Sequence, residues 1–208
     1  MNARLIAVTK PVIELENSGT EGLVAYCARV SNPANQDADP KKLLSYCKEH
    51  GHWSVFEMAN AVVEVEAPRD ITRQMLRHRS FSFQEFSQRY SDQIEFTERQ
   101  FRRQDTKDRQ NSIDDLSSDV LNRAEVGAYV ASNTAGNVYE EMLKKGIAKE
   151  CARVVLPEGL TMSRMYVNGT LRSWMHYLDV RLGNGTQREH VQLAEKIKEV
   201  LSPVMEDM

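Results

Sequence analysis

The sequence predicts an α+β fold in which a few strands are segregated from many helices. Residues 3–9 have the composition of a strand, and residues 61–67 alternate apolar and polar side chains as a half-buried strand does. Elsewhere, most apolar residues recur three and four positions apart, which is the spacing of one helix face. The chain of 208 residues is long enough for one well-buried core and requires no second domain. We therefore expect a single domain over residues 1–208.

Two helices are predicted between these strands. The first begins at Thr20, a residue type suited to an N-cap, and ends before Pro33. The second begins after Asp39, has Pro40 in its first turn and ends at Gly51. Their buried stripes are Leu23, Val24, Cys27 and Val30 in the first helix, and Leu43, Leu44 and Cys47 in the second.

Several further helices are predicted after the strand at 61–67. Pro68 breaks that strand, and a helical segment begins near Asp70. Residues 91–120 are polar, mixed in charge and poor in apolar periodicity, so we expect a surface excursion within the domain. Later helices are expected over 121–145, 146–157 and 170–182, and a last one opens at Thr186, which has capping-box spacing to Glu189.

Composition excludes some classes of protein. Hydrophobic residues make up 41% and charged residues 27%, and no run of about 18 apolar residues appears, so a membrane span is not expected. The N-terminus lacks the uninterrupted apolar core of a secretory signal, which predicts a cytoplasmic location. Three widely spaced cysteines without a CxxC pair predict reduced core residues and no metal site.

The most informative segment runs from Arg69 to Arg89. It contains five arginines, two acidic residues and no lysine, a local charge of +3 in a chain whose net charge is −3. The planar guanidinium grips phosphate or carboxylate in two places, so the cluster predicts recognition of a shaped anion, which we take to be a nucleotide phosphate. The alternative is a solvated face with acidic neighbours from elsewhere in the fold.

The spacing of these arginines bears on that choice. If the segment from Asp70 to Arg79 is helical, Arg69, Arg73 and Arg77 form one stripe, and each like-charged pair costs about 0.2–0.5 kcal/mol. A bound anion would relieve this repulsion.

Two other side chains in the segment have chemistry of interest. Ser87 and Arg89 together offer a hydroxyl and a guanidinium to one phosphate, and the sequence supplies no base that would make Ser87 a nucleophile. His78 lies between two arginines, whose charge disfavours the cationic ring. A neutral His78 could stack or form hydrogen bonds with a ligand, and a purely structural histidine is the competing interpretation.

The pattern RHRx7S, from Arg77 to Ser87, resembles the signature of flavin-dependent thymidylate synthases. The resemblance extends over nearly the whole chain. It includes ARVS at 28–31, HWSVFE at 52–57, Gln74, Glu85, Arg89 with Tyr90, ECAR at 150–153, and Arg172 with Arg181.

The resemblance implies a small antiparallel sheet packed by several helices, and a homotetramer whose active sites lie where subunits meet. It also implies reductive methylation of dUMP to dTMP in de novo dTMP biosynthesis. FAD reduced by NADPH would be the hydride source, 5,10-methylenetetrahydrofolate the one-carbon donor and tetrahydrofolate a product.

The family pattern also implies roles for individual residues. Those expected to bind dUMP are Gln74, Arg77, Glu85, Phe86, Ser87, Gln88, Arg89, Arg153 and Arg181. Those expected to bind FAD are Ser54, Arg77, His78, Arg79, Glu85, Thr170, Arg172 and His176. Arg181 is the candidate catalytic residue, placed beside the uracil to favour the ring's ionised form. An internal ion pair would otherwise be the commoner explanation of an arginine at the edge of an apolar stripe.

Four positions depart from the commoner family pattern, and all lie in or near the expected flavin site. They are Gln84, Thr170, His176 and Gly185. Two alternative functions stay open: a nucleotide-binding flavoprotein without folate chemistry, and an RNA-binding module. The RNA-binding module would use Phe81, Phe83, Phe86 and Tyr90 as stacking surfaces.

Overall fold

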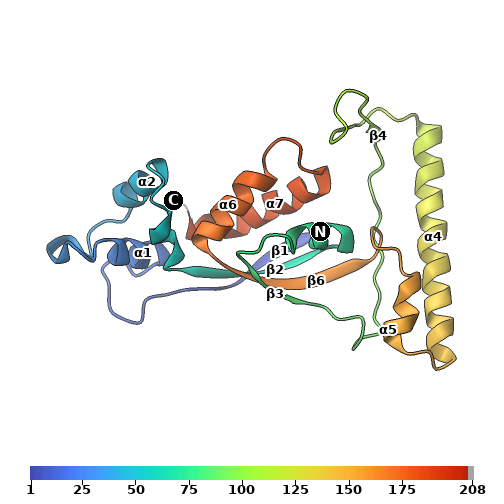
Figure 1. Cartoon of the computed structure of the whole chain (residues 1–208), viewed down its shortest axis with the longest axis horizontal. Helices are drawn as coiled ribbons and strands as arrows, with labels where there is room; N and C mark the ends of the chain where they lie inside the picture. Colours follow the sequence, from blue (N-terminus) through green and yellow to red (C-terminus); the bar gives the residue numbers. More distant parts are fainter. Residues whose placement is uncertain (206–208) are drawn as a thin grey trace.

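A four-stranded antiparallel sheet forms the centre of the computed structural model, which describes residues 1–205 (Figure 1). The strand order is β1-β2-β6-β3. The strands are β1 Asn2–Val8, β2 Asn60–Pro68, β6 Met162–Thr170 and β3 Ser82–Glu85. The α+β prediction with a small antiparallel sheet is therefore confirmed.

The strand β6 lies in the middle of this sheet and has no counterpart in the sequence-based prediction. Its residues alternate between buried and exposed positions, as a strand with one covered face requires. Two of the buried positions are Ser163 and Gly169, so the apolar alternation is too weak to recognise. Gly169 is needed because a Cβ atom there would lie 2.2 Å from the ring of Phe81.

The helices occupy three places around the sheet (Figure 1). The helices α6 Leu171–Arg181 and α7 Arg188–Leu201 lie over one face of it. At one end are α1 Thr20–Ala28 and α2 Lys41–Glu49, and beyond the other end are α4 Ser118–Lys144 and α5 Lys149–Ala152. The remaining elements are α3 Arg69–Met75, the 3-10 turns η1 Pro33–Asn35, η2 Trp53–Glu57, η3 Arg153–Val155 and η4 Ser202–Val204, and the short strands β4 Arg103–Gln104 and β5 Ser112–Ile113.

The main core lies between the sheet and the two covering helices. Fully buried members include Val63, Val65, Met165, Val167, Trp174, Tyr177, Leu193 and Ile197. The indole N–H of Trp174 donates to the carbonyl of Ala61 at 3.1 Å, which satisfies the one polar atom of that side chain. The opposite face of the sheet presents polar side chains, among them Arg164 and Glu66, which pair at 3.3 Å.

Two of the predicted helix caps are wrong. Thr20 lies inside α1, and its hydroxyl donates to the carbonyl of Thr9. Thr186 donates to the carbonyl of Val180, so it does not cap α7. In both cases a carbonyl from a preceding segment competes for the hydroxyl, which a local pattern does not reveal.

The end predicted for α2 agrees with the structure, whereas its N-cap is Pro40, one residue later than the predicted Asp39. A carboxylate oxygen of Asp39 still accepts the backbone N–H of Lys41, the first residue of the helix, at 3.1 Å. Gly51 has φ of +70°, the left-handed conformation that commonly follows the end of a helix.

The cysteines only partly match their prediction. Cys47 is buried, and burial raises the pKa of its thiol; Cys27 is half-buried, and Cys151 is exposed, so the core assignment is wrong for Cys151. No helix within residues 1–205 is long and apolar enough to cross a bilayer. In the same part of the chain, no group of three or more His, Cys, Asp or Glu side chains is placed to hold a metal ion.

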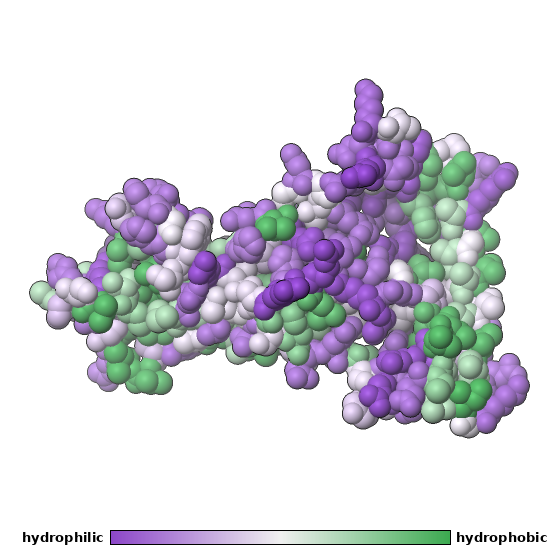
Figure 2. Space-filling model, viewed as in Figure 1, coloured by the Kyte–Doolittle hydropathy of each residue, from purple (hydrophilic) through white to green (hydrophobic). Residues whose placement is uncertain are grey.

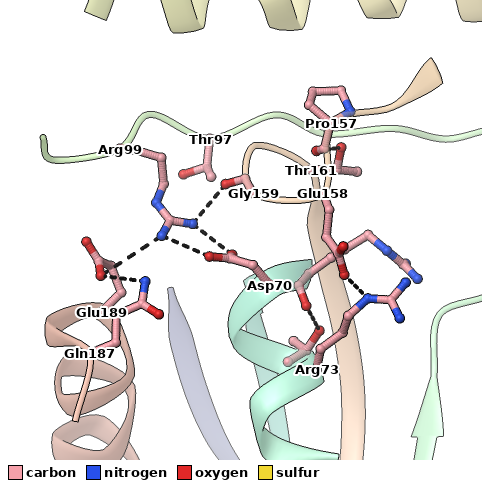
Figure 3. Close-up of polar contacts among 12 residues, drawn as sticks. Asp70, Arg73, Thr97, Arg99, Pro157, Glu158, Gly159, Thr161, Gln187 and Glu189 are labelled. Atoms are coloured by element: carbon pink, nitrogen blue, oxygen red, sulfur yellow. Dashed lines mark hydrogen bonds and ion pairs between the residues drawn. The ribbon is translucent and has the colours of Figure 1, made fainter. Parts of the chain in front are cut away.

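The segment between β3 and α4 is fixed to the body of the domain by two arginines. Arg99 donates both outer nitrogens to Asp70, at 2.8 and 3.1 Å, and one of them also to the carbonyl of Gly159 at 2.8 Å (Figure 3). Arg102 donates to Glu189 at 2.7 Å, and both of these side chains are more than nine-tenths buried. Together with backbone hydrogen bonds of Glu95 and Thr97 to Met162 and Leu160, these charged groups hold the predicted excursion against the domain.

These contacts distinguish two neighbouring arginines. Replacing Arg102 by leucine leaves the buried Glu189 carboxylate without its main cation, and we expect the free energy of unfolding to fall by about 3 kcal/mol. Arg103 pairs with Asp115 in solvent, so Arg103→Leu is the matched control and should change stability little. Urea unfolding at one fixed protein concentration measures both, and equal losses would contradict the assigned role of Arg102.

Candidate active site

The end of α6 meets the turn that follows α3. Arg181, the last residue of α6, donates its Nε–H to Nε2 of His78 at 2.9 Å. One of its outer nitrogens donates to the backbone carbonyl of Gln74 at 3.3 Å. The sequence-predicted residues Gln74, His78 and Arg181 are therefore brought together by segments about a hundred residues apart.

The ring of His78 is neutral in this arrangement. Its Nε2 accepts a hydrogen bond, which requires an unprotonated nitrogen. Burial, followed by the charges of Arg181, His176 and Arg77, lowers its pKa to about 4. The predicted neutral ring is confirmed, although burial has a larger effect than the neighbouring like charge.

A series of buried and partly buried hydrogen bonds leads from the core to the side chain of Gln74. The Tyr177 hydroxyl lies 3.0 Å from Nε2 of His190, and Nδ1 of His190 lies 3.2 Å from the side-chain oxygen of Gln74. The Gln74 amide donates to the side-chain oxygen of Gln187 at 2.7 Å, and the Gln187 amide donates to Glu189 at 3.0 Å. Of these residues, only Gln74 was predicted as part of the site.

The predicted stripe of repelling arginines is wrong. The helix α3 ends at Met75, before the stripe could reach its third arginine. Arg73 pairs with Glu158, and an outer nitrogen of Arg69 lies 3.6 Å from Glu85. The start of the cluster is thus neutralised within the chain, as the solvated-face alternative proposed.

The next two arginines of the cluster differ from those before them. Arg77 and Arg79 are exposed and have no carboxylate partner among residues 1–205. Arg77 also contributes to lowering the pKa values of His78 and Arg181, although burial has the larger effect on both. These two guanidinium groups remain available to an anion.

A cavity of about 430 Å³ lies beside this cluster, between η2 and α6. Trp53, Glu57, Arg172 and His176 are among the residues that line it. Arg172 pairs with Glu57 across it. The predicted residues Arg172 and His176 therefore share one cavity, and Ser54 lies exposed in the same η2 turn.

Other predicted ligands gather at α5. Arg89 donates its Nε–H to Glu150 at 3.0 Å, and both side chains are more than half exposed. The backbone N–H of Arg89 donates to the Ser87 hydroxyl at 3.3 Å. Arg153, which follows α5, has no carboxylate partner among residues 1–205.

Three further predicted ligands from the signature are buried or half-buried, and two of them form hydrogen bonds inside the chain. A carboxylate oxygen of Glu85 accepts from the hydroxyl of Ser163 at 2.7 Å. The backbone N–H of Phe86 donates to the carbonyl of Arg164 at 2.8 Å, and Gln88 is buried. The contacts of Glu85 and Phe86 join the end of β3 to β6.

The predicted dUMP ligands thus form two groups. Gln74, Arg77 and Arg181 lie where α3 and α6 meet, whereas Ser87, Arg89 and Arg153 lie at α5. Within the described residues, no hydrogen bond or ion pair joins the two groups directly. Figure 1 shows α5 beside α4, well away from α6.

Comparison with known proteins identifies the family. The family model described as thymidylate synthase complementing protein matches residues 12–206. A flavin-dependent thymidylate synthase from Synechocystis sp. is 48% identical over 199 residues, which span 93% of this chain and 91% of that protein. This chain belongs to the flavin-dependent thymidylate synthase family. A probable flavin-dependent thymidylate synthase from Paramecium bursaria Chlorella virus 1 is also 48% identical, over 96% of this chain and 93% of that protein.

A solved structure has the same fold. The UMP/dUMP methylase PolB from Streptomyces cacaoi, determined with 5-Br dUMP bound, superposes with a TM-score of 0.83 at 26% identity. The superposition covers 99% of this chain and 92% of that chain.

Two of the four departures from the common pattern of flavin-dependent thymidylate synthases have a local structural reason, and the other two are described by their location. Thr170 caps α6, because its hydroxyl accepts the backbone N–H of Ser173 at 3.2 Å. Gly185 has φ of +81°, a conformation that a histidine would adopt only with strain. Gln84 is exposed on the edge strand β3, and His176 lines the cavity.

The buried His190, which is hydrogen-bonded to Gln74, predicts that the stability of the protein depends on pH. Burial, with smaller effects of Arg181 and His78, lowers the pKa of His190 from 6.5 to about 3. Between these values the unfolded chain binds the proton and the folded chain does not, so stability is present above pH 6.5 and falls as the pH falls toward 3. His190→Asn should make this dependence shallower by up to about 1.4 kcal/mol per pH unit. Urea unfolding between pH 7 and 4.5 measures it, and parallel curves for the two proteins would contradict it.

Proposed function

We propose that this protein converts dUMP to dTMP by reductive methylation. The one-carbon donor would be 5,10-methylenetetrahydrofolate, the hydride source FAD reduced by NADPH, and tetrahydrofolate a product. The observation that carries the proposal is the placement of Arg181, which is held by a neutral histidine and a backbone carbonyl at the end of α6, the helix that also lines the cavity. Arg77 and Arg79, which flank that histidine, have no carboxylate partner among residues 1–205. Family membership and the dUMP analogue in the similar structure support the substrate.

The residues around the cavity fit a flavin dinucleotide. Arg77 and Arg79 have no carboxylate partner among residues 1–205 and can pair with a pyrophosphate, while Trp53 and His176 offer ring surfaces. When bound, FAD would supply the redox chemistry. The proposed FAD ligands are Ser54, Arg77, His78, Arg79, Glu85, Thr170, Arg172 and His176.

The group at α5 fits the phosphate of dUMP. Ser87, Arg89 and Arg153 supply a hydroxyl and two guanidinium groups, which is the donor set expected for a phosphate. Arg89 is paired with Glu150, but that pair is exposed and is readily exchanged for a dianion.

Arg181 is proposed to act on the uracil. Its contacts with His78 and Gln74 use two of the five N–H donors of the guanidinium, and the others remain for a ligand. Because the group is held in place before substrate binds, its charge stabilises negative charge on the ring without reorganisation. His78 serves this role only as a neutral acceptor, which its environment ensures.

We propose a homotetramer in which different chains complete each site. The separation of the two dUMP groups within one chain supports this arrangement. The long helix α4 also exposes Val126, Tyr129 and Val130, each more than half exposed, and Figure 2 shows hydrophobic residues along it. An apolar stripe of this kind on a helix that stands away from the core is typical of an interface.

The RNA-binding alternative is not supported by the aromatic residues of the signature. Phe81 is buried, and Phe83 and Phe86 are half-buried, so they do not form a stacking surface. Tyr90 alone of the four is exposed. The flavoprotein without folate chemistry is distinguished by the following assay.

The proposed reaction is tested by omission. Purified protein with dUMP, 5,10-methylenetetrahydrofolate, NADPH and FAD should produce dTMP, measured by chromatography. Omitting dUMP, 5,10-methylenetetrahydrofolate or NADPH should abolish the product, and omitting FAD should abolish it once the bound flavin has been removed. Oxidation of NADPH stimulated by dUMP without dTMP formation would instead favour the flavoprotein alternative.

Arg181→Ala provides the matching loss of function. We expect dTMP formation to fall by at least about 100-fold, because a preorganised donor to the uracil is removed. Flavin absorbance of the purified variant should stay close to wild type, since most proposed FAD contacts are unchanged. Full turnover by the variant would refute the role of Arg181.

The oligomer has its own test. Val130→Glu places a charge in the apolar stripe of α4, and we expect it to dissociate the tetramer into smaller species in analytical ultracentrifugation. Lys144→Glu, at the exposed end of the same helix, is the control and should sediment like wild type. A tetrameric Val130→Glu protein would exclude this face as the interface.

A further inference from the structure

The hydrogen-bond chain behind Gln74 has a fixed direction. A carboxylate can only accept, and Glu189 accepts from Arg102 and from the Gln187 amide nitrogen. Gln187 therefore turns its oxygen to Gln74, which must donate its own amide nitrogen to it at 2.7 Å. The charge of Glu189 thus sets the orientation of both carboxamides.

The same logic continues to the other end of the chain. With its nitrogen given to Gln187, Gln74 presents its oxygen to His190, whose Nδ1 must then carry the proton. Nε2 of His190 is left as an acceptor for the Tyr177 hydroxyl at 3.0 Å. Each donor in this series of hydrogen bonds faces an acceptor only when the side chains are oriented in this way.

Gln74 is also held from its backbone side. Its carbonyl accepts from Arg181, and its side chain is held by His190 and Gln187. The carboxamide keeps one N–H and one oxygen lone pair that these contacts do not use. A glutamine that is free to rotate by 180° would present these two groups in either order.

His190 cannot contact a ligand itself, because it is fully buried. It lies against the ring of Tyr177, with 5.8 Å between ring centroids, and Tyr177 in turn lies 5.1 Å from the ring of His78. The histidine is therefore enclosed between the core of α6 and Gln74. Its remaining polar function is the hydrogen bond to Gln74.

We propose that His190 is a positioning residue for the dUMP site, which holds the Gln74 carboxamide in one orientation so that a single donor–acceptor pair faces the substrate. The proposal rests on the proposed function, in which Gln74 contacts dUMP. Glu189 fixes the direction of the hydrogen bonds at one end, and His190 completes them at the other end by donating its Nδ1–H to the side-chain oxygen of Gln74.

The test uses the FAD-loaded protein and isothermal titration calorimetry with dUMP. H190L removes the donor to Gln74 and should weaken dUMP binding about tenfold, which is the loss of one net hydrogen bond. H190N keeps an N–H near the position of Nδ1 and should bind within about threefold of wild type. The KM for dUMP should rise in parallel with the dissociation constant, with a smaller change in kcat.

A double-mutant cycle shows whether the effect passes through Gln74. Q74L alone should weaken dUMP binding, and adding H190L to Q74L should change it by less than about twofold, because the group being positioned is gone. Independent, multiplying effects of the two substitutions would overturn the proposal. If H190L does not fold, the comparison of H190N with H190Q decides, since only the asparagine keeps a donor near Nδ1; equal dUMP affinity of these two variants would also overturn it.

The same measurements separate this inference from the proposed function. A wild-type protein that neither binds dUMP nor produces dTMP would refute the proposed function. A wild-type protein that does both, with an H190L variant of unchanged affinity, would refute only the role of His190.

Discussion

The carboxylate of Glu189 is the group on which both the excursion and the site depend. Burial alone would raise its pKa, but hydrogen bonds from Arg102, from its own backbone and from Gln187 outweigh burial and keep the pKa below its usual value. The ionised group therefore serves two neighbours at once. It fixes the segment before α4 through Arg102, and it orders the amides that lead to Gln74. The anchoring of the segment before α4 and the geometry of the site therefore both depend on the buried charge of Glu189.

The arginines of this protein divide by what they contact. Arg69 and Arg73 lie close to carboxylates of the same chain. Arg99 pairs with Asp70, and this pair also holds the excursion against the domain. Arg77 and Arg79 have none among residues 1–205, and they lie beside the one turn where α3 and α6 meet. A cluster that looks uniform in sequence is therefore partly structural and partly available for binding.

Much of the fold could be predicted from the sequence, because helix limits have local causes. Asp39, which accepts the first N–H of α2, and Gly51, a left-handed residue just after its end, lie close to the limits of that helix, and both are visible as residue types. The central strand β6 could not be recognised, because Ser163 and Gly169 occupy buried positions for tertiary reasons. The same holds for Thr186, whose hydroxyl is taken by a carbonyl that the sequence does not place near it.

Knowledge of the site has a similar limit. The RHRx7S pattern located Arg77 and His78, and the contact of His78 with Arg181 follows from the fold. His190 could not be predicted, since a single histidine in an amphipathic helix carries no local signal of its partners. The division of the dUMP ligands into two groups is likewise a property of the tertiary structure.

The exposed pair of Arg89 and Glu150 has a consequence for which molecules can occupy the site. If Arg89 binds the substrate phosphate as proposed, Glu150 acts as an internal competitor that occupies the guanidinium in the free protein. A nucleotide can replace it, because it exchanges one anion for another of higher charge. A neutral nucleoside has no phosphate to replace the carboxylate of Glu150, so the pair of Arg89 and Glu150 stays intact. Selection at this end of the site would then depend on charge, before the shape of the base is tested at Arg181.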